Sequence, residues 1–159
     1  MPTVPCLPQT PPFRLLDRIV EHDSASGSLV AEKQVSVDDA LWPADQAHSP
    51  LRYFPQTLLI EALCQAAAAY NMLSAAGPSD ADAANPSAAA HRGYLVGVTD
   101  LRFPNFVEMG QTLRLYVKKQ QSMGALVSFW AEAHAIDFTE SASSRQVVCG
   151  RLLFSLVAA

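Results

Sequence analysis

The sequence predicts an α+β protein in which an antiparallel sheet curves around one long helix. Three features predict this class: one long apolar helical segment, one strand-like segment before it, and a series of strand-like segments after it. A helix followed by a run of strands is typical of α+β proteins with an antiparallel sheet. Residues 1–159, half of them hydrophobic, provide enough apolar material for one domain with a sizeable core.

The first part of the chain is expected to be extended and then to form a strand. Five of the first twelve residues are proline, which fixes φ and removes a backbone donor, so they predict an extended arm. Residues 13–23 (FRLLDRIVEHD) suit either a short helix or an irregular segment packed on the core. Apolar residues then alternate from Leu29 to Val37, interrupted by Lys33, and this period of two predicts a strand.

The long helix is predicted from Gln56 to Leu73. Apolar residues recur there at alternating spacings of four and three and form one stripe, made of Leu59, Leu63, Ala66, Tyr70 and Leu73. The remaining faces are also mostly apolar, and a helix that is apolar all round is buried. We therefore expect a sheet on one side of this helix and a partner surface on the other.

The rest of the chain reads as a loop and four strands. Residues 74–92 are rich in Ala, Ser and Pro without apolar periodicity, which indicates a flexible surface loop at this point of the domain. Strand-like patterns follow over residues 93–103, 112–120, 125–136 and 147–157. Gly124, between the second and third of these, marks a hairpin turn.

Charge and cysteine content argue against several classes of function. A net charge of −4 argues against nucleic-acid binding, which normally requires a basic surface. No apolar run approaches the ~20 residues that span a bilayer, and the N-terminus lacks the pattern of a secretory signal. The three cysteines, Cys6, Cys64 and Cys149, are odd in number and lack metal-type spacing, which suits a reducing compartment. We expect a cytoplasmic protein without a membrane or nucleic-acid partner.

Glu61 is the residue of the predicted helix that most needs an explanation. An ionised carboxylate in apolar surroundings is costly, so such a group is paired, hydrogen-bonded or neutral. A carboxylic acid that stays neutral near pH 7 can donate a proton, as a general acid must. The alternative is that Glu61 reaches solvent or accepts a hydrogen bond from a neighbouring amide.

Two further features upstream of Glu61 could take part in the same chemistry. His48 lies in a proline-bounded loop before the helix, and imidazole is the usual base at neutral pH. It could equally be a solvated loop histidine. The backbone amides at the helix start, Gln56 and Thr57, can stabilise a developing oxyanion. Together these groups fit proton abstraction next to a carbonyl, followed by loss of a β-leaving group.

Three segments in the same order carry a resemblance to a known family. LPQTPPFRLLDRIVEHD is similar to the LPHRYPFLLVDRV opening of bacterial 3-hydroxyacyl-acyl-carrier-protein dehydratases. HSPLRYFPQTLLIEALCQAA resembles their HFPGxPxxPGxLxxEALAQ segment, and GYLVGVTDLRFPNFVEMGQTLRL resembles AGIDxARFxxxVxPGDxLxL. The resemblance implies a hotdog fold: a long central helix wrapped by a curved antiparallel sheet of about five to six strands. It also implies a homodimer, or a higher homo-oligomer such as a trimer of dimers.

The resemblance further implies a role for each candidate residue. His48 would remove a proton from C2 of a 3-hydroxyacyl thioester, and Glu61 of the other subunit would protonate the departing hydroxyl group. The amide of Gln56 or Thr57 would stabilise the enolate-like oxygen. Residues expected to contact the substrate are Phe54, Gln65, Val96 and Phe103, and residues expected to dock an acidic acyl carrier protein are Arg52 and Arg102. The substrate would be carried on phosphopantetheine, and neither a metal nor an organic cofactor is expected.

The sequence also departs from the family pattern near the candidate site. Ala47 replaces the glycine before the histidine, the segment from the histidine to the glutamate is one residue shorter, and Gln56 replaces the glycine of PG. These changes resemble the dehydratase-like proteins of polyketide and aryl-polyene gene clusters. Two alternative functions remain open at this stage: a thioesterase in which Glu61 activates water, and a non-catalytic subunit that binds an acyl carrier protein.

Overall fold

The computed structural model describes residues 4–5, 7–36, 53–75, 92–137 and 143–157. These residues form one helix and six strands. In chain order, the elements are β1 (Arg18–Asp23), β2 (Ser28–Gln34), α1 (Gln56–Ala75), β3 (Arg92–Arg102), β4 (Thr112–Met123), β5 (Leu126–Asp137) and β6 (Ser143–Val157). The order of helix and strands is the one that the sequence predicts, with one additional strand at the beginning.

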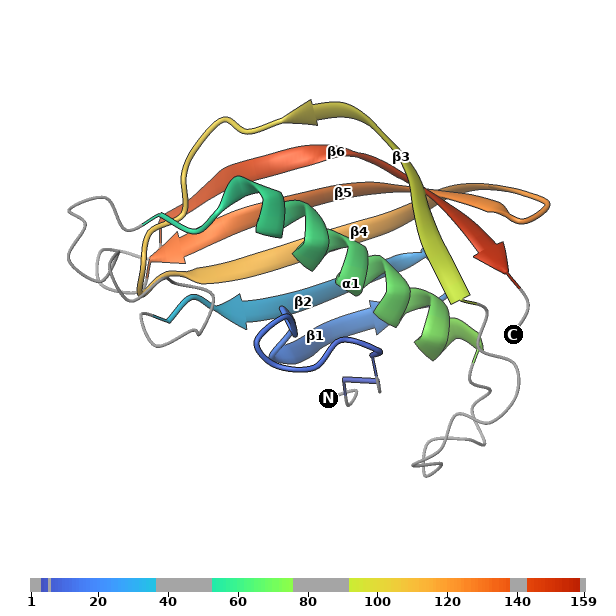
Figure 1. The fold of residues 1–159 in the computed structure, drawn as a ribbon, viewed down its shortest axis with the longest axis horizontal. Coiled ribbons are helices and arrows are strands. Elements are labelled where there is room, and N and C mark those ends of the chain that lie inside the picture. The colour runs from blue at the N-terminus through green and yellow to red at the C-terminus, as the bar shows by residue number, and fades with distance from the viewer. Residues whose placement is uncertain (1–3, 6, 37–52, 76–91, 138–142, 158–159) are drawn as a thin grey trace.

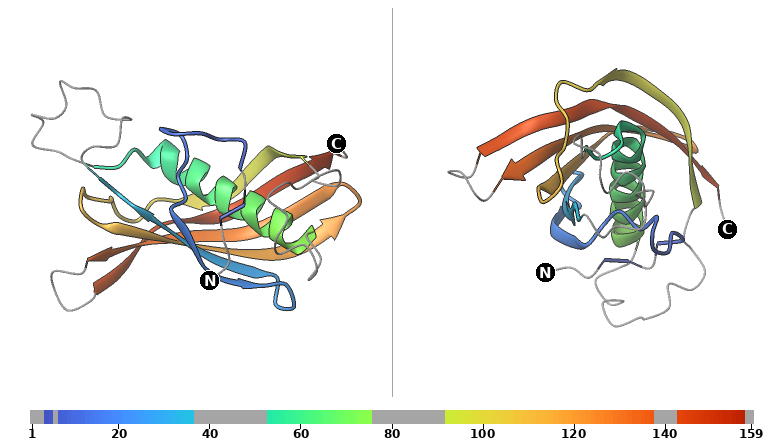
Figure 2. Two further views of the ribbon diagram at one scale, coloured as in Figure 1. Left: turned by 90° about the horizontal axis from the view of Figure 1, so that it is seen from below. Right: turned by 60° about the vertical axis from the view of Figure 1, so that its left-hand side comes forward.

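All six strands belong to one antiparallel sheet in the order β1-β2-β4-β5-β6-β3. The sheet curves around α1, which lies in its concave side (Figures 1 and 2). Strand β3 follows the helix in sequence but pairs with β6 at the far end of the sheet. The predicted α+β class, with a curved antiparallel sheet around one helix, is confirmed.

The core lies between the concave face of the sheet and the helix. Phe129 of β5 is fully buried, and its ring meets that of Tyr70 of α1 at 5.6 Å between centroids and that of Phe154 of β6 at 5.9 Å. Both contacts are edge-to-face, a favoured arrangement of aromatic rings. The next residue, Trp130, points to the convex face and is partly exposed, as the predicted alternation in this strand requires.

Helix α1 is the central element of this core. The stripe predicted from the sequence is buried for Leu59, Leu63, Ala66 and Tyr70, whereas Leu73 is half-buried. By length and composition α1 could cross a membrane, but its stripe packs on the sheet, so it is the core helix of the fold. A second row at four-residue spacing, Ile60, Cys64 and Ala68, is only partly covered in the single chain.

The expectation for residues 13–23 is wrong in its second half. Residues 18–23 form β1, which pairs with β2 along its length, with one bulge after Ile19. Ile19 is buried and Arg18 faces outward, so this short strand has one apolar and one polar side. Six residues are too few for periodicity alone to decide, and pairing with the edge of β2 decides the conformation. Leu15 and Leu16, just before the strand, pack on the core without regular structure.

The hairpin between β4 and β5 confirms the turn predicted at Gly124. Two residues, Gly124 and Ala125, connect Met123 to its partner Leu126. Gly124 has a φ of 59°, in the left-handed region that glycine adopts without steric cost. The glycine therefore closes the hairpin. Most of the loop predicted over residues 74–92 lies outside the described residues.

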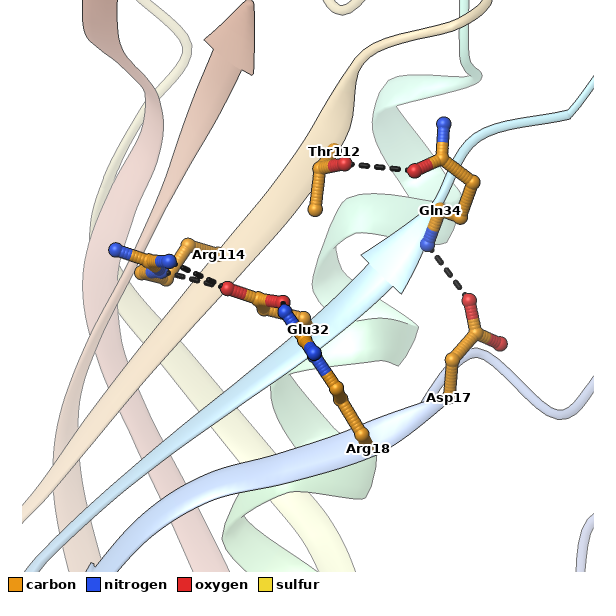
Figure 3. Close-up of polar contacts among 6 residues, drawn as sticks. All are labelled: Asp17, Arg18, Glu32, Gln34, Thr112 and Arg114. Carbon is orange, nitrogen blue, oxygen red and sulfur yellow. Dashed lines mark hydrogen bonds and ion pairs between the residues drawn. The ribbon is translucent and has the colours of Figure 1, made fainter. Parts of the chain in front are cut away.

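Glu32 of β2 carries a buried carboxylate on the convex side of the sheet. It stands in register with Arg18 of β1 and Arg114 of β4, and Figure 3 shows its carboxylate between the two guanidinium groups. Arg114 donates to Oε1 from Nε and Nη2, at 2.9 and 2.6 Å, and Arg18 Nε donates to Oε2 at 2.6 Å. Burial raises the pKa of Glu32, but the hydrogen bonds from Arg114 and Arg18 outweigh it, so the net shift is downward.

Glu32→Gln is expected to destabilise the protein at neutral pH and to have a smaller effect in acid. A carboxyl group whose pKa is lowered on folding stabilises the fold above its unfolded pKa, here about 4.5. This stabilisation is lost as pH falls through the lower, folded value. Thermal unfolding of wild type and variant between pH 7 and pH 3 measures the difference. A difference that stays constant over this range would contradict the assignment.

Candidate active site

Three polar residues follow one another along a single face of α1. Thr57, Glu61 and Gln65 are spaced by four residues, and side chains at this spacing are neighbours on a helix. Their exposure decreases along the helix: Thr57 is exposed, Glu61 is half-buried, and Gln65 is buried. The face therefore leads from the surface at the helix start into the interior.

Glu61 is held by two amide side chains. Gln65 Nε2 donates to Glu61 Oε1 at 2.8 Å, and Gln9 Nε2 donates to the same oxygen at 3.2 Å. Gln9 belongs to the N-terminal arm, 52 residues away in the chain. The carboxyl group thus accepts hydrogen bonds from neighbouring amides, which is the alternative that the sequence leaves open for Glu61, and its role as an acid stays a prediction.

The orientation of the Gln65 amide follows from its surroundings. The backbone N–H of Leu15 donates to Oε1 of Gln65 at 2.8 Å, so this atom must be the carbonyl oxygen. Both N–H groups of Nε2 then donate hydrogen bonds, one to the backbone oxygen of Phe13 at 2.7 Å and one to Glu61. These contacts make Gln65 a residue that positions Glu61 and fastens the N-terminal arm to the helix, and its predicted contact with substrate stays a prediction.

Cys64, beside Glu61 on the helix, has an unreactive thiol. Burial raises the pKa of Cys64 to about 12, and the negative charge of Glu61 adds to this effect. Since the thiolate is the nucleophilic form, a thiol with this pKa is a poor nucleophile at neutral pH. Cys64 therefore serves as a small apolar residue of the helix.

The start of α1 provides backbone donors near Glu61. Helix geometry leaves the amides of Gln56 and Thr57 without intrahelical acceptors, and Leu58 N donates back to Pro55 O at 3.0 Å. Thr57 lies one helical turn before Glu61 on the same face. The positive end of the helix dipole is therefore on the same side of the helix as Glu61, and the predicted oxyanion role of the two amides stays a prediction.

The other candidate residues occupy different parts of the fold. Phe54 is in the core with 1% exposure, Phe103 is half-buried after β3, and Val96 is 53% exposed on β3. Arg102 is exposed at the end of β3. His48 and Arg52 lie outside the described residues. The predicted roles of these residues in substrate contact, catalysis and docking stay predictions.

Gln9 is the site residue that sequence reasoning misses. It lies in the proline-rich arm, and its local sequence contains no sign that it returns to α1. The return is produced by tertiary contacts: Leu7, Leu15 and Leu16 are buried in the core on either side of it. Its place in LPQTPPF, within the segment that resembles the family's opening, was the available signal.

Comparison with known proteins identifies relatives along most of the chain. A family model described as a FabA-like domain matches residues 7–138, which contain the arm, α1 and the first five strands. The 3-hydroxyacyl-[acyl-carrier-protein] dehydratase FabZ of Bordetella petrii is 33% identical over 127 residues, 80% of this chain and 79% of the relative. FabZ of Xanthomonas oryzae pv. oryzae is 29% identical over 144 residues, 90% of this chain and 85% of the relative.

Solved structures show the same architecture at lower identity. The dehydratase heterocomplex ApeI:P from Xenorhabdus doucetiae matches with a TM-score of 0.68 and 19% identity, covering 95% of this chain and 88% of that one. A hypothetical thioesterase with coenzyme A from Streptococcus pneumoniae TIGR4 matches with a TM-score of 0.59 and 7% identity, covering 89% and 85%. At these identities the likeness establishes the hotdog fold alone.

Proposed function

Because the chain belongs to the FabA-like family, we propose that it removes water from a 3-hydroxyacyl thioester and releases the trans-2-enoyl thioester. The family membership and the FabZ relatives support this class of chemistry. The single observation that carries the proposal is the position of Glu61. It is a half-buried carboxyl group on the core helix, held by two amides, one helical turn after Thr57 at the helix start.

In the proposed mechanism, the chain supplies a base, an oxyanion donor and an acid. His48 takes the proton from C2, and the amide of Gln56 or Thr57 donates to the thioester oxygen as negative charge develops there. The electron pair of the C2–H bond forms the C2–C3 double bond, and the C3–O bond breaks. Glu61 gives its proton to the departing hydroxyl group, which leaves as water. Acid–base chemistry of this kind completes the reaction without a metal or an organic cofactor.

The active form is proposed to be a homodimer in which His48 and Glu61 meet across the interface. Strand β3 is the last strand of the sheet, and its Tyr94, Leu95 and Val96 are 42–56% exposed. An edge strand with apolar side chains favours pairing with another strand. The row of Ile60, Cys64 and Ala68 on α1 is also only partly covered in one chain. A second copy would cover both surfaces, and further association into a trimer of dimers is compatible with the family resemblance.

The thioester is proposed to arrive on the phosphopantetheine arm of an acidic acyl carrier protein in the cytoplasm. The FabZ relatives are named for substrates of this kind. Arg102, exposed at the end of β3, and Arg52 are proposed to contact the carrier. A local group of cations is needed because the whole chain carries a net charge of −4 and would repel an acidic partner.

The test is to incubate the purified protein with a 3-hydroxyacyl thioester on an acyl carrier protein and to follow two products. Mass spectrometry measures loss of water from the acyl chain, and a thiol reagent measures release of free phosphopantetheine thiol. The proposal expects loss of water without thiol release. Thiol release with an intact hydroxyl group would favour a thioesterase. If neither product forms, catalysis by the isolated chain is refuted.

A second candidate is a non-catalytic subunit that binds the acyl carrier protein and works beside another hotdog protein. Two observations favour it: Gln56 stands where the family has glycine at the helix start, and the ApeI:P structure is a heterocomplex. Tight binding of an acyl carrier protein without turnover by the chain alone would support this candidate. Turnover by the isolated homodimer would exclude it.

A further inference from the structure

The two oxygens of Glu61 have different environments. Oε1 accepts two hydrogen bonds, from Gln65 Nε2 at 2.8 Å and from Gln9 Nε2 at 3.2 Å. Among the described residues, none donates a hydrogen bond to Oε2. When the carboxyl group carries a proton, the oxygen that accepts two hydrogen bonds serves as its carbonyl oxygen, so the proton is carried by Oε2. The two amides therefore determine which oxygen can deliver a proton.

Gln9 can act on Glu61 because the N-terminal arm is fastened on both sides of it. Leu7, two residues earlier, is buried with 6% exposure. Further along, the backbone of Phe13 and Leu15 is bonded to the amide of Gln65, at 2.7 and 2.8 Å. The arm is therefore bound to the helix by the residue that also contacts the carboxyl group. The position of the Gln9 amide depends on the fold rather than on local flexibility.

The carbonyl oxygen of the Gln9 amide is in an unfavourable environment, which points to a role other than stability. Its Oε1 is enclosed, and no residue in the described parts of the chain donates a hydrogen bond to it. Enclosing a carbonyl oxygen without a donor destabilises a protein, and an apolar side chain of the same length would avoid that cost. The contact of Nε2 with Glu61 is the feature that an apolar side chain would lose.

We propose that Gln9 is a positioning residue for Glu61. This proposal rests on the dehydratase function proposed above. Gln9 and Gln65 restrain the carboxyl group so that Oε2 is presented to the departing hydroxyl group. After the proton moves from Oε2 to that hydroxyl group and water leaves, the same N–H bonds stabilise the carboxylate that remains. Gln9 contacts the acid through its amide, so it should affect the chemical step more than substrate binding.

The test compares Gln9→Met with wild type in steady-state dehydration and in thermal unfolding. We expect kcat to fall roughly tenfold, because one N–H bond to a charged group is lost, while KM stays within about twofold. The melting temperature should stay equal or rise, because the enclosed carbonyl is removed. Gln9→His retains an N–H donor of similar reach and should restore kcat to within about threefold of wild type.

Two further variants complete the design. Gln121→Met makes the same change at an exposed position of β4 and should alter neither kcat nor melting temperature. Gln9→Asn is polar but one methylene shorter, so it should lose kcat like Gln9→Met even if methionine disturbs the arm. Unchanged kcat in both Gln9→Met and Gln9→Asn would overturn the proposal. A fall in kcat that accompanies a fall in melting temperature in both variants would also overturn it.

The outcomes also separate this inference from the proposed function. If wild type removes no water from any 3-hydroxyacyl thioester offered, the dehydratase function fails and the role of Gln9 fails with it. If wild type turns over and the Gln9 variants equal it, only the role of Gln9 is refuted. Loss of kcat without loss of melting temperature, restored by histidine, supports both.

Discussion

Glu61→Gln is expected to lower kcat for dehydration by about a thousandfold, within the range assigned to general acid–base catalysis. The amide has nearly the same shape as the carboxyl group. Its oxygen can still accept the hydrogen bonds from Gln9 and Gln65, so the fold should be retained. The variant lacks the proton that must reach the departing hydroxyl group, and this loss affects the chemical step.

The measurement is the rate of enoyl thioester formation, with circular dichroism and thermal unfolding as checks on the fold. Glu21→Gln, an isosteric change at an exposed position of β1, is the matched control and should keep full activity. Turnover by Glu61→Gln within threefold of wild type would remove Glu61 from the mechanism.

His48→Ala should be inactive for a complementary reason, since the base would be missing. If the two residues of one site come from different subunits, co-expression of His48→Ala with Glu61→Gln creates one intact site in each mixed dimer. Random pairing makes half of the dimers mixed, so about a quarter of the wild-type activity is expected. No recovery in isolated mixed dimers would place both residues of a site in one chain.

Phe129→Ala is expected to reduce the free energy of unfolding by about 3–5 kcal/mol, a large part of the total for a domain of this size. Phe129 is fully buried and connects Tyr70 of the helix to Phe154 of β6 through two edge-to-face contacts. Its removal leaves a cavity between α1 and the sheet and also loses both ring contacts. The helix that carries Glu61 would lose part of its support.

Denaturant unfolding measures this effect, and Trp130→Ala is the matched control. Trp130 is the next residue and also aromatic, but it lies on the convex face with 36% exposure. We expect Trp130→Ala to reduce the free energy of unfolding by less than half as much as Phe129→Ala, because truncating a side chain at the surface leaves no enclosed cavity. Equal losses in the two variants would mean that the concave face of β5 is not the core.

Much of the fold could be predicted from the sequence because it follows from local periodicity. The stripe of α1 and the alternation in β5 are repeated over several turns or residue pairs, so burial of one face determines the structure. Strand β1 could not be predicted in this way. It is short, and its conformation depends on pairing with β2, which is a contact between segments.

The candidate site likewise has features that follow from local sequence and features that depend on contacts between distant segments. Glu61 could be found from the sequence, since a single carboxylate on an apolar helix is conspicuous, and its neighbour Gln65 lies on the same face by helical spacing alone. The hydrogen bonds of Gln65 could not be predicted, because its partners, Phe13 and Leu15, are 50 or more residues away. Distant backbone atoms, rather than the spacing along the helix, determine what that amide can do.

By itself the sequence determined the class of the fold and the central helix, because both depend on regular repeats of side chains along a local segment. Only the tertiary structure decided that the N-terminal arm returns to Glu61 and that two amides bind one of its oxygens. The physical reason is that Gln9 and Glu61 are 52 residues apart in the chain. Only the folded core brings Gln9 Nε2 within 3.2 Å of Glu61 Oε1. No local pattern encodes that distance.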